Sequence, residues 1–514
     1  MTPERPPLAR AAFVVAGATG AALVALSGGY GYHRDELYFL VAGAHPAWGY
    51  PDQPPLTPLL ARATTLLGDS LYALRLPSAL AIAAVVVLTA LIAREFGARP
   101  GAQLLAACAT AVSTVVIAVG HLLSTTTFDL LAWTALSWLL ARALRCADPG
   151  RAGPDSADPG WGTSIRGGPV WLAAGLVAGI GLLNKTLFAF YLAALVVALL
   201  AVGPRAALRS PWPWLGAGVA LVLWLPNLLW QAGHGWPLLE LSTSIAAGGS
   251  ASSEPRWLFL PFQLVLMGLL LVPVWGIGLW RLLRDPQLRT FRLFGIAYPL
   301  LTAVFIATGG KPYYLAGLYP VLLAAGAGPV WDWARRGAAT LRTGLVGAAL
   351  AVTAASSAVL MLPLVPPHAL AGTPIPEVNS DAGATLGWPA LVATVAGVHR
   401  DLPPDERRQA VILTANYGEA GALEQARSRL DLPPVFSGHN GFADWGPPPD
   451  GATPTIAVGL SRATLDELFA SVTPVARIDN GLGLDTEEQG RTVWVCREQR
   501  RSWSEQWPQI RFIG

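Results

Sequence analysis

Long apolar runs recur through the first two thirds of the chain and constrain its fold more than any other feature. Ten of them approach or exceed the length needed to cross the roughly 30 Å hydrocarbon core of a bilayer. They cover approximately residues 11–28, 71–93, 101–119, 127–145, 169–203, 213–231, 258–283, 291–308, 315–333 and 341–364. The run at 169–203 is about twice the usual length, and its interruption at Asn184-Lys185 predicts a tight hairpin of two helices. We therefore expect a polytopic α-helical membrane protein with about eleven transmembrane helices.

Composition favours a membrane protein over a soluble protein with a large core. Only 13% of the 514 residues are charged and the mean hydropathy is +0.46, whereas soluble chains carry about 25% charged residues. The net charge of +3 gives no sign of a nucleic-acid-binding surface. The three cysteines are far apart and form no CxxC pair, which argues against a disulfide framework or a structural zinc site. We interpret the first apolar run as a retained helix, because no clear signal-peptide cleavage site follows it.

The distribution of arginine predicts the orientation of the chain, because cytoplasmic loops are enriched in basic residues. If the N-terminus is cytoplasmic, the inner segments hold seventeen arginines, while the outer segments before residue 365 hold Arg34, Arg62, Arg75 and Arg256. An odd number of helices then places everything after about residue 365 outside. We predict a multi-pass protein of the plasma membrane with an extracytoplasmic C-terminal domain. Cys496, if exposed there, should react with an impermeant thiol reagent.

Three regions are expected along the chain. Residues 1–364 form a transmembrane catalytic domain with a first outer loop at 29–70, residues 365–376 form a Pro/Gly-rich linker, and residues 377–514 form a small α/β domain. In the last region we expect strands at 410–414, 455–459 and 492–496, and helices at 419–430 and 462–471, the second capped by Ser461. Residues 148–168 and 246–253 have the composition of flexible loops. The second of these is either a lid over a site or a plain mobile loop.

The first outer loop combines carboxylates with aromatic residues. Asp35 and Glu36 follow Tyr30 and Tyr32, and Asp52 lies further on among prolines. Carboxylates can take a hydroxyl proton or hold a divalent cation, and aromatic rings can stack on sugars. The alternative is a solvated loop beside an interfacial aromatic belt.

Ionisable residues also occur within the apolar runs. Asp129 and Lys185 lie inside two of them, and His121 lies near Asp129 at the turn between two predicted helices. A charge at the centre of a bilayer costs about 2.5–3.5 kcal/mol on insertion scales, so such residues usually face a cavity with a function. The alternatives are a helix-packing ion pair or cap for Asp129 and snorkelling at the hairpin tip for Lys185.

Lys311 is the other of only two lysines among 35 basic residues. It belongs to the segment Gly309-Gly310-Lys311-Pro312-Tyr313-Tyr314. Two preceding glycines would let the lysine approach a phosphate closely, although an ordinary outer loop fits too. In the C-terminal region, residues 416–423 lie at a predicted strand-to-helix turn and resemble a small-molecule-binding loop, without a GxGxxG pattern.

Together these motifs resemble a known family. The chain is similar to the GT-C membrane glycosyltransferases of family 39, in the bacterial branch that includes aminoarabinose transferases and relatives of protein O-mannosyltransferases. The resemblance rests on the Asp35-Glu36 pair, the acidic-x-Pro-Pro-Leu motif at 52–56, Lys185 after a Gly-rich helix, and the segments at 311–314 and 318–320. The sequence departs from the aminoarabinose transferases at Gln53, where those enzymes carry a lysine.

The resemblance implies inverting transfer of a sugar from a polyprenyl-phosphate donor to an envelope lipid, glycan or protein at the outer membrane face. The implied catalytic residues are Asp35 and Glu36, with Asp35 favoured as the base that activates the acceptor. The expected substrate-binding residues are Asp52, His121, Asp129, Lys185, Lys311, Tyr313 and Tyr314. The resemblance implies no cofactor other than a candidate divalent cation, which Asp35, Glu36 or Asp52 could hold.

The chemistry is consistent with these residue types. A polyprenyl phosphate is a fair leaving group when cations neutralise its developing charge, and a carboxylate can serve as the base. A lipid or solute transporter would also place charges in a helical bundle, but the two corresponding halves typical of transporters are not evident. A non-catalytic assembly protein of the envelope is the third hypothesis.

Overall fold

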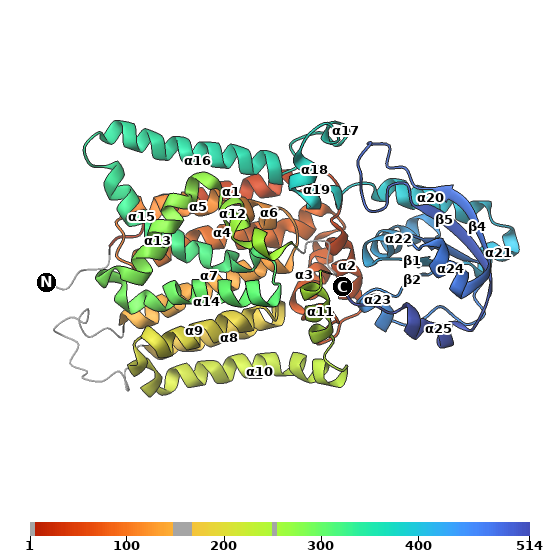
Figure 1. The fold of residues 1–514 in the computed structure, drawn as a ribbon, viewed down its shortest axis with the longest axis horizontal. Coiled ribbons are helices and arrows are strands. Elements are labelled where there is room, and N and C mark those ends of the chain that lie inside the picture. Colours follow the sequence, from red (N-terminus) through yellow and green to blue (C-terminus); the bar gives the residue numbers. More distant parts are fainter. Residues whose placement is uncertain (1–5, 147–166, 249–253) are drawn as a thin grey trace.

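The computed structural model describes residues 6–146, 167–248 and 254–514. Helices from the first two thirds of the chain lie side by side along the long axis of the molecule, and the C-terminal domain packs against one end of this bundle (Figure 1). The loop expected at 148–168 falls almost wholly outside the described residues, as do positions 249–253 of the segment expected at 246–253.

The apolar runs form helices close to their predicted positions. These helices are α1 (Ala11–Leu26), α4 (Leu71–Glu95), α5 (Pro100–Val112), α6 (Thr114–His121), α7 (Thr125–Cys146), α8 (Gly168–Asn184), α9 (Phe188–Val202), α10 (Pro211–Gly233), α12 (Phe259–Met267), α13 (Val272–Arg284), α14 (Arg292–Thr308), α15 (Tyr319–Ala334) and α16 (Ala339–Met361). The predicted hairpin at 169–203 is confirmed, because α8 ends at Asn184 and α9 begins only at Phe188.

Helix length and breaks decide how many spans the described residues contain. Five helices are long and apolar enough to cross a membrane, and two bent pairs raise the number to seven. The first pair, α5 and α6, is bent by 57°. The second pair, which contains α12 and α13, is bent by 86° at Gly268. Gly268 adopts φ +94, a conformation that favours glycine. Shorter apolar helices such as α1, α8 and α9 fall below the length criterion, so a total of eleven spans stays a prediction.

A layer of short helices lies between the bundle and the C-terminal domain. It comprises α2 (Arg34–Ala44), α3 (Leu56–Thr64), α11 (Pro237–Ala246) and, after α16, α17 (Pro367–Leu370), α18 (Ile375–Val378) and α19 (Ser380–Gly383). The helices α2, α3 and α11 lie near the junction in Figure 1. This layer brings the first outer loop between the two main bodies of the protein.

The C-terminal domain is built on a five-stranded mixed sheet. Its elements are α20 (Trp388–Asp401), α21 (Pro404–Gln409), β1 (Val411–Thr414), α22 (Tyr417–Leu430), β2 (Val435–Ser437), α23 (Gly441–Asp444), β3 (Thr455–Val458), α24 (Arg462–Leu468), β4 (Phe469–Arg477), β5 (Thr492–Gln499) and α25 (Trp503–Ile510). The strand order is β2-β1-β3-β5-β4. The first three strands are parallel, with Ile412 opposite both Val435 and Ile456, and β5 is antiparallel to both of its neighbours.

The α/β prediction for this domain is confirmed, with corrections. The three expected strands are present, and the Ser461 side chain caps α24 by accepting from the Thr464 N–H. The helix expected to reach residue 471 ends at Leu468, because β4 begins at Phe469 and pairs with β5. Cys496 is fully buried, so the condition for its reaction with an impermeant thiol reagent is not met.

The core of the C-terminal domain includes a residue from the other end of the sequence. Leu37 of α2 is buried in the same apolar cluster as Leu391, Ile412 and Leu423. Burial of apolar surface stabilises a contact by about 25 cal/mol per Å². The burial of Leu37 therefore helps to hold α2 against the C-terminal domain.

Candidate functional site

The N-terminus of α2 sets the directions of the two adjacent acids. His33 is the N-cap: its ring Nδ1 accepts from the Asp35 N–H at 3.2 Å, and the His33 N–H donates to Glu36 Oε2 at 2.8 Å. This reciprocal capping box turns Glu36 back toward the helix start. Asp35, one position earlier, therefore projects in a different direction.

Glu36 is fully buried and bound to Arg75 of α4. Arg75 donates to both carboxylate oxygens at 2.8 Å, and the Leu123 N–H donates to Oε1 at 2.8 Å. Burial opposes ionisation, yet Arg75 and the backbone donors hold the pKa of Glu36 below its usual range. Arg75 also donates to the carbonyls of Ser27 and Gly31. Arg34 pairs with Glu487 and not with Glu36.

Asp35 presents a partly accessible carboxylate at the junction. Its side chain is 40% exposed, whereas Glu36 is fully buried. The Tyr417 hydroxyl, from the first turn of α22, donates to Asp35 Oδ1 at 2.8 Å. The second oxygen, Oδ2, lies 3.9 Å from His33 Nδ1. The Asp35 carboxylate can therefore contact a ligand while its Oδ1 accepts a hydrogen bond from the C-terminal domain.

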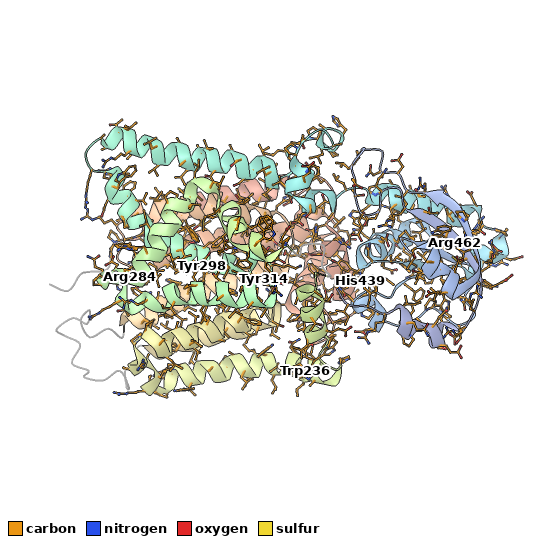
Figure 2. All side chains as sticks on the ribbon, viewed as in Figure 1. Trp236, Arg284, Tyr298, Tyr314, His439 and Arg462 are labelled. Carbon is orange, nitrogen blue, oxygen red and sulfur yellow. The ribbon has the colours of Figure 1, made fainter. Side chains whose placement is uncertain are left out.

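Lys185 lies at the end of α8 and faces two tyrosines from a distant segment. Its ammonium donates to Thr126 Oγ1 at 3.1 Å and lies 5.3 Å and 5.4 Å from the ring centroids of Tyr313 and Tyr314. Such cation–π contacts are geometrically favourable within about 6 Å. Figure 2 shows Tyr314 in the bundle, on the side that faces the junction.

Lys311 lies in the loop between α14 and the 3₁₀ turn η8 (Pro312–Leu318), close to Lys185 and Asp35. Burial and the positive charge of Lys185 lower the pKa of Lys311 to about 8, against the opposing effect of Asp35 and Asp381. The predicted lysines and the favoured base thus belong to one electrostatic neighbourhood.

Gln263 of α12 anchors the loop that carries Lys311. Its Nε2 donates to the Pro312 carbonyl at 2.7 Å, and its Oε1 accepts from Tyr319 at 2.6 Å and from Tyr298 at 3.2 Å. A buried amide with its partners satisfied rigidifies its surroundings. Gly309, at φ +71, makes the turn that ends α14 before this loop.

Asp52 is bound by Tyr38, which lies one turn from Asp35 on α2 and whose ring centroid is 5.0 Å from that of Tyr417. The Tyr38 hydroxyl donates to Asp52 Oδ1 at 2.8 Å and accepts from the Gly441 N–H of the C-terminal domain at 3.1 Å. Burial raises the pKa of Asp52 to about 7. The adjacent Gln53 is buried, and its Nε2 has no hydrogen-bond partner among the described residues.

Asp129 and His121 are both buried but lie in different surroundings. Asp129 accepts from the Trp133 indole N–H at 2.9 Å and lies within electrostatic range of Lys185. His121 lines a cavity with Asp381 at the end of α16, and the lining of this cavity does not include Tyr313 or Tyr314. His121 Nδ1 has no hydrogen-bond partner among the described residues.

Four functional candidates were not predicted from the sequence: Arg75, Tyr38, Asp381 and Tyr417. Asp381 lies 3.6 Å from His33 Nε2. Tyr417 lies within the 416–423 motif that the sequence marks as a strand-to-helix turn. No local signal distinguishes Arg75 from the other arginines.

Among the described residues, no three His, Cys, Asp or Glu side chains form a group that could hold a metal ion.

A family model described as dolichyl-phosphate-mannose-protein mannosyltransferase matches residues 52–151 and 165–230. These segments, 166 of the 514 residues, are similar to this glycosyltransferase family. They include Asp52, Asp129 and Lys185, while Asp35 and Lys311 lie outside them. Comparison with curated proteins gave no match.

Solved structures with a similar fold cover most of this chain. ArnT from Cupriavidus metallidurans bound to undecaprenyl phosphate is 16% identical, with a TM-score of 0.58 over 94% of this chain and 97% of that chain. Its apo state has the same score and identity, over 94% and 96%. AglB, an oligosaccharyltransferase from Archaeoglobus fulgidus in complex with an inhibitory peptide and a dolichol-phosphate, is 14% identical, with a TM-score of 0.51 over 80% and 63%. The fold is therefore similar to that of ArnT, with a C-terminal mixed-sheet domain.

Proposed function

We propose that this protein transfers a sugar, with inversion, from a polyprenyl-phosphate donor to a hydroxyl group of an envelope acceptor. One observation carries the proposal: Asp35, Lys185 and Lys311, from three distant segments, share one electrostatic neighbourhood at the end of the bundle. A base beside two ammonium groups matches what this reaction needs, which is a proton acceptor for the hydroxyl and positive charge for the departing phosphate.

Lys185 and Lys311 are assigned to the donor phosphate. Both lie where helices of the bundle end near the junction, so a lipid held in the membrane could reach them with its phosphate. Tyr313 and Tyr314 flank Lys185 and would line the same pocket. Asp129, buried beside Lys185, would hold that ammonium in place.

Asp35 is assigned as the base. It would take the proton of the acceptor hydroxyl while the hydroxyl oxygen forms a bond to the anomeric carbon. The bond from that carbon to the phosphate oxygen breaks, and its electron pair leaves with the polyprenyl phosphate. The 40% exposure of Asp35 supports this role. Glu36, whose two oxygens are occupied by Arg75 and backbone donors, would act by positioning α2.

Asp52 and Tyr38 are assigned to the acceptor side. Tyr38 binds Asp52, contacts the C-terminal domain through Gly441, and lies beside Tyr417, the partner of Asp35. The acceptor is proposed as a lipid, glycan or protein of the envelope that presents a hydroxyl group. His121 is a weaker candidate for the same side, through the cavity it shares with Asp381.

The proposed arrangement in the membrane has eleven spans, a cytoplasmic N-terminus and the C-terminal domain outside the plasma membrane. Counting α1, α7, α8 and α9 as spans together with the five long helices and two bent pairs gives eleven. The arginine excess supports the orientation.

The activity is tested with purified protein in vesicles that contain a panel of polyprenyl-phosphate hexoses and pentoses, with envelope lipid extract as acceptor. We expect sugar transfer and release of polyprenyl phosphate, with the anomeric configuration of the product inverted. Vesicles without acceptor, loaded to measure solute uptake and lipid flipping, are the control. Solute uptake or lipid flipping without sugar transfer would reject the glycosyltransferase function and support a transporter.

A further inference from the structure

The 416–423 motif of the C-terminal domain contacts the proposed base directly. Tyr417 is the first residue of α22, and Asn416 caps that helix by accepting from the Glu419 N–H at 2.9 Å. Glu419 accepts in return from the Asn416 N–H at 3.2 Å. This capping box fixes the direction in which α22 starts, and therefore where the Tyr417 hydroxyl lies.

Two glycines allow α22 to approach α2 closely. A Cβ on Gly421 would lie 2.8 Å from Leu37 Cβ and 2.9 Å from the Leu37 carbonyl carbon, and a Cβ on Gly418 would lie 2.9 Å from Arg34 Cβ. These distances are shorter than van der Waals contact. Any larger residue would therefore move α22 away from α2, and with it Tyr417 away from Asp35.

Arg34, the first residue of α2, also contacts Tyr417 and the C-terminal domain. Its guanidinium lies 5.1 Å from the centroid of the Tyr417 ring and pairs with Glu487 of the C-terminal domain. Asn416 Nδ2 also donates to Glu487 at 3.3 Å. Burial and the negative charge of Asp35 keep the pKa of Tyr417 well above its usual range, so the phenol stays protonated and remains a donor.

We propose that the C-terminal domain completes the active centre, with Tyr417 as a positioning residue for the base. By donating to Asp35 Oδ1, Tyr417 fixes the carboxylate rotamer and directs Oδ2 toward the acceptor hydroxyl. The inference rests on the function proposed above. It gives the C-terminal domain a role in the transfer step, since a domain that served only as a cover would not contact the base.

Tyr417→Phe tests this role because it removes one hydroxyl and keeps the ring. We expect kcat to fall by about tenfold to a hundredfold, the effect of a misplaced reacting group, with KM for the donor and the thermal unfolding temperature close to wild type. Tyr72→Phe is the control. It removes a hydroxyl from a side chain of α4 that is 51% exposed, and it should keep wild-type kcat.

A double-mutant cycle separates positioning from a merely structural contact. If Tyr417 acts through Asp35, Tyr417→Phe should lower kcat much less in an Asp35→Asn background than in wild type. Equal losses in both backgrounds would overturn the inference. Gly421→Ala, which displaces α22 but keeps the phenol, should reproduce the loss in kcat.

The outcomes for the two proposals are distinguishable. Absence of transfer by the wild-type protein from every donor in the panel would reject the proposed function, and this inference with it. Transfer by the wild type with an equal kcat for Tyr417→Phe would reject only the role of Tyr417.

Discussion

Glu36 and Arg75 form a fully buried ion pair in which two guanidinium nitrogens lie 2.8 Å from the two carboxylate oxygens. The pair joins α2, which carries the proposed base, to α4 of the bundle. Arg75 reaches the carbonyls that precede α2 as well. The position of Asp35 relative to the membrane helices therefore depends on its neighbour in the sequence.

Glu36→Gln should destabilise the protein. Removing one partner of a buried ion pair leaves an uncompensated charge and costs about 3–5 kcal/mol. We expect a clear decrease in the thermal unfolding temperature in detergent, and Arg75→Met should behave similarly. Arg408→Met, which breaks the exposed pair with Asp405, is the control and should leave that temperature unchanged. If Glu36→Gln were as stable as wild type but inactive, Glu36 would take part in the chemistry.

Asp35→Asn should lower turnover by about 10²–10⁴-fold, the usual contribution of a positioned base, with donor binding and expression close to wild type. The amide keeps the shape of the side chain and removes its ability to accept the proton. Asp69→Asn alters an exposed acid of the same loop and should keep its activity. Retention of more than about a tenth of turnover in Asp35→Asn would transfer the role of base to Asp52.

Lys185→Met and Lys311→Met should each weaken donor binding by about tenfold to a hundredfold, because charge-assisted hydrogen bonds to phosphate contribute about 1.5–3 kcal/mol. The measurement is the Kd of a polyprenyl-phosphate hexose, in an Asp35→Asn background that prevents turnover. Arg256→Met removes an exposed positive charge and serves as the control. Unchanged Kd values for both lysine variants would place the phosphate elsewhere.

Donor affinity should decrease above about pH 8. The pKa of Lys311 is lowered to about 8, so the ammonium that attracts phosphate is present below this pH and is lost as the pH rises through it. The phosphodiester of the donor has no ionisation of its own in this range. Kd should therefore increase by up to about tenfold per pH unit above pH 8. Lys311→Arg should bind with little dependence on pH up to 10, because arginine stays charged. A flat profile in the wild type would exclude Lys311 from the phosphate site.

The orientation of the C-terminal domain can be tested with introduced cysteines. In a variant without native cysteines, Val475→Cys at a position 45% exposed should react with an impermeant maleimide in intact cells. Arg336→Cys, between α15 and α16, should react only after the membrane is opened. The reverse pattern would invert the topology. Native Cys496 is unsuitable for this test because it is buried.

Local sequence patterns were enough to predict the helical membrane part, the break of the 169–203 run at Lys185, and the three central strands of the C-terminal sheet. They also indicated the acids and lysines considered for the site. These features are local, because hydropathy and residue periodicity are read within single segments. The strand β2, three residues long after two prolines, and the strand β4, which directly follows a helix, give no comparable local pattern. Only pairing within the sheet defines them.

The tertiary structure decided which of two adjacent acids is accessible. Asp35 and Glu36 are equivalent in the sequence. Glu36 is buried because it forms an ion pair with Arg75, 39 residues away in the chain. Tyr417, 382 residues from Asp35, holds Asp35 at the junction. Such long-range contacts arise from the packing of α2 between the bundle and α22, where close approach and buried charge select partners that no local pattern specifies.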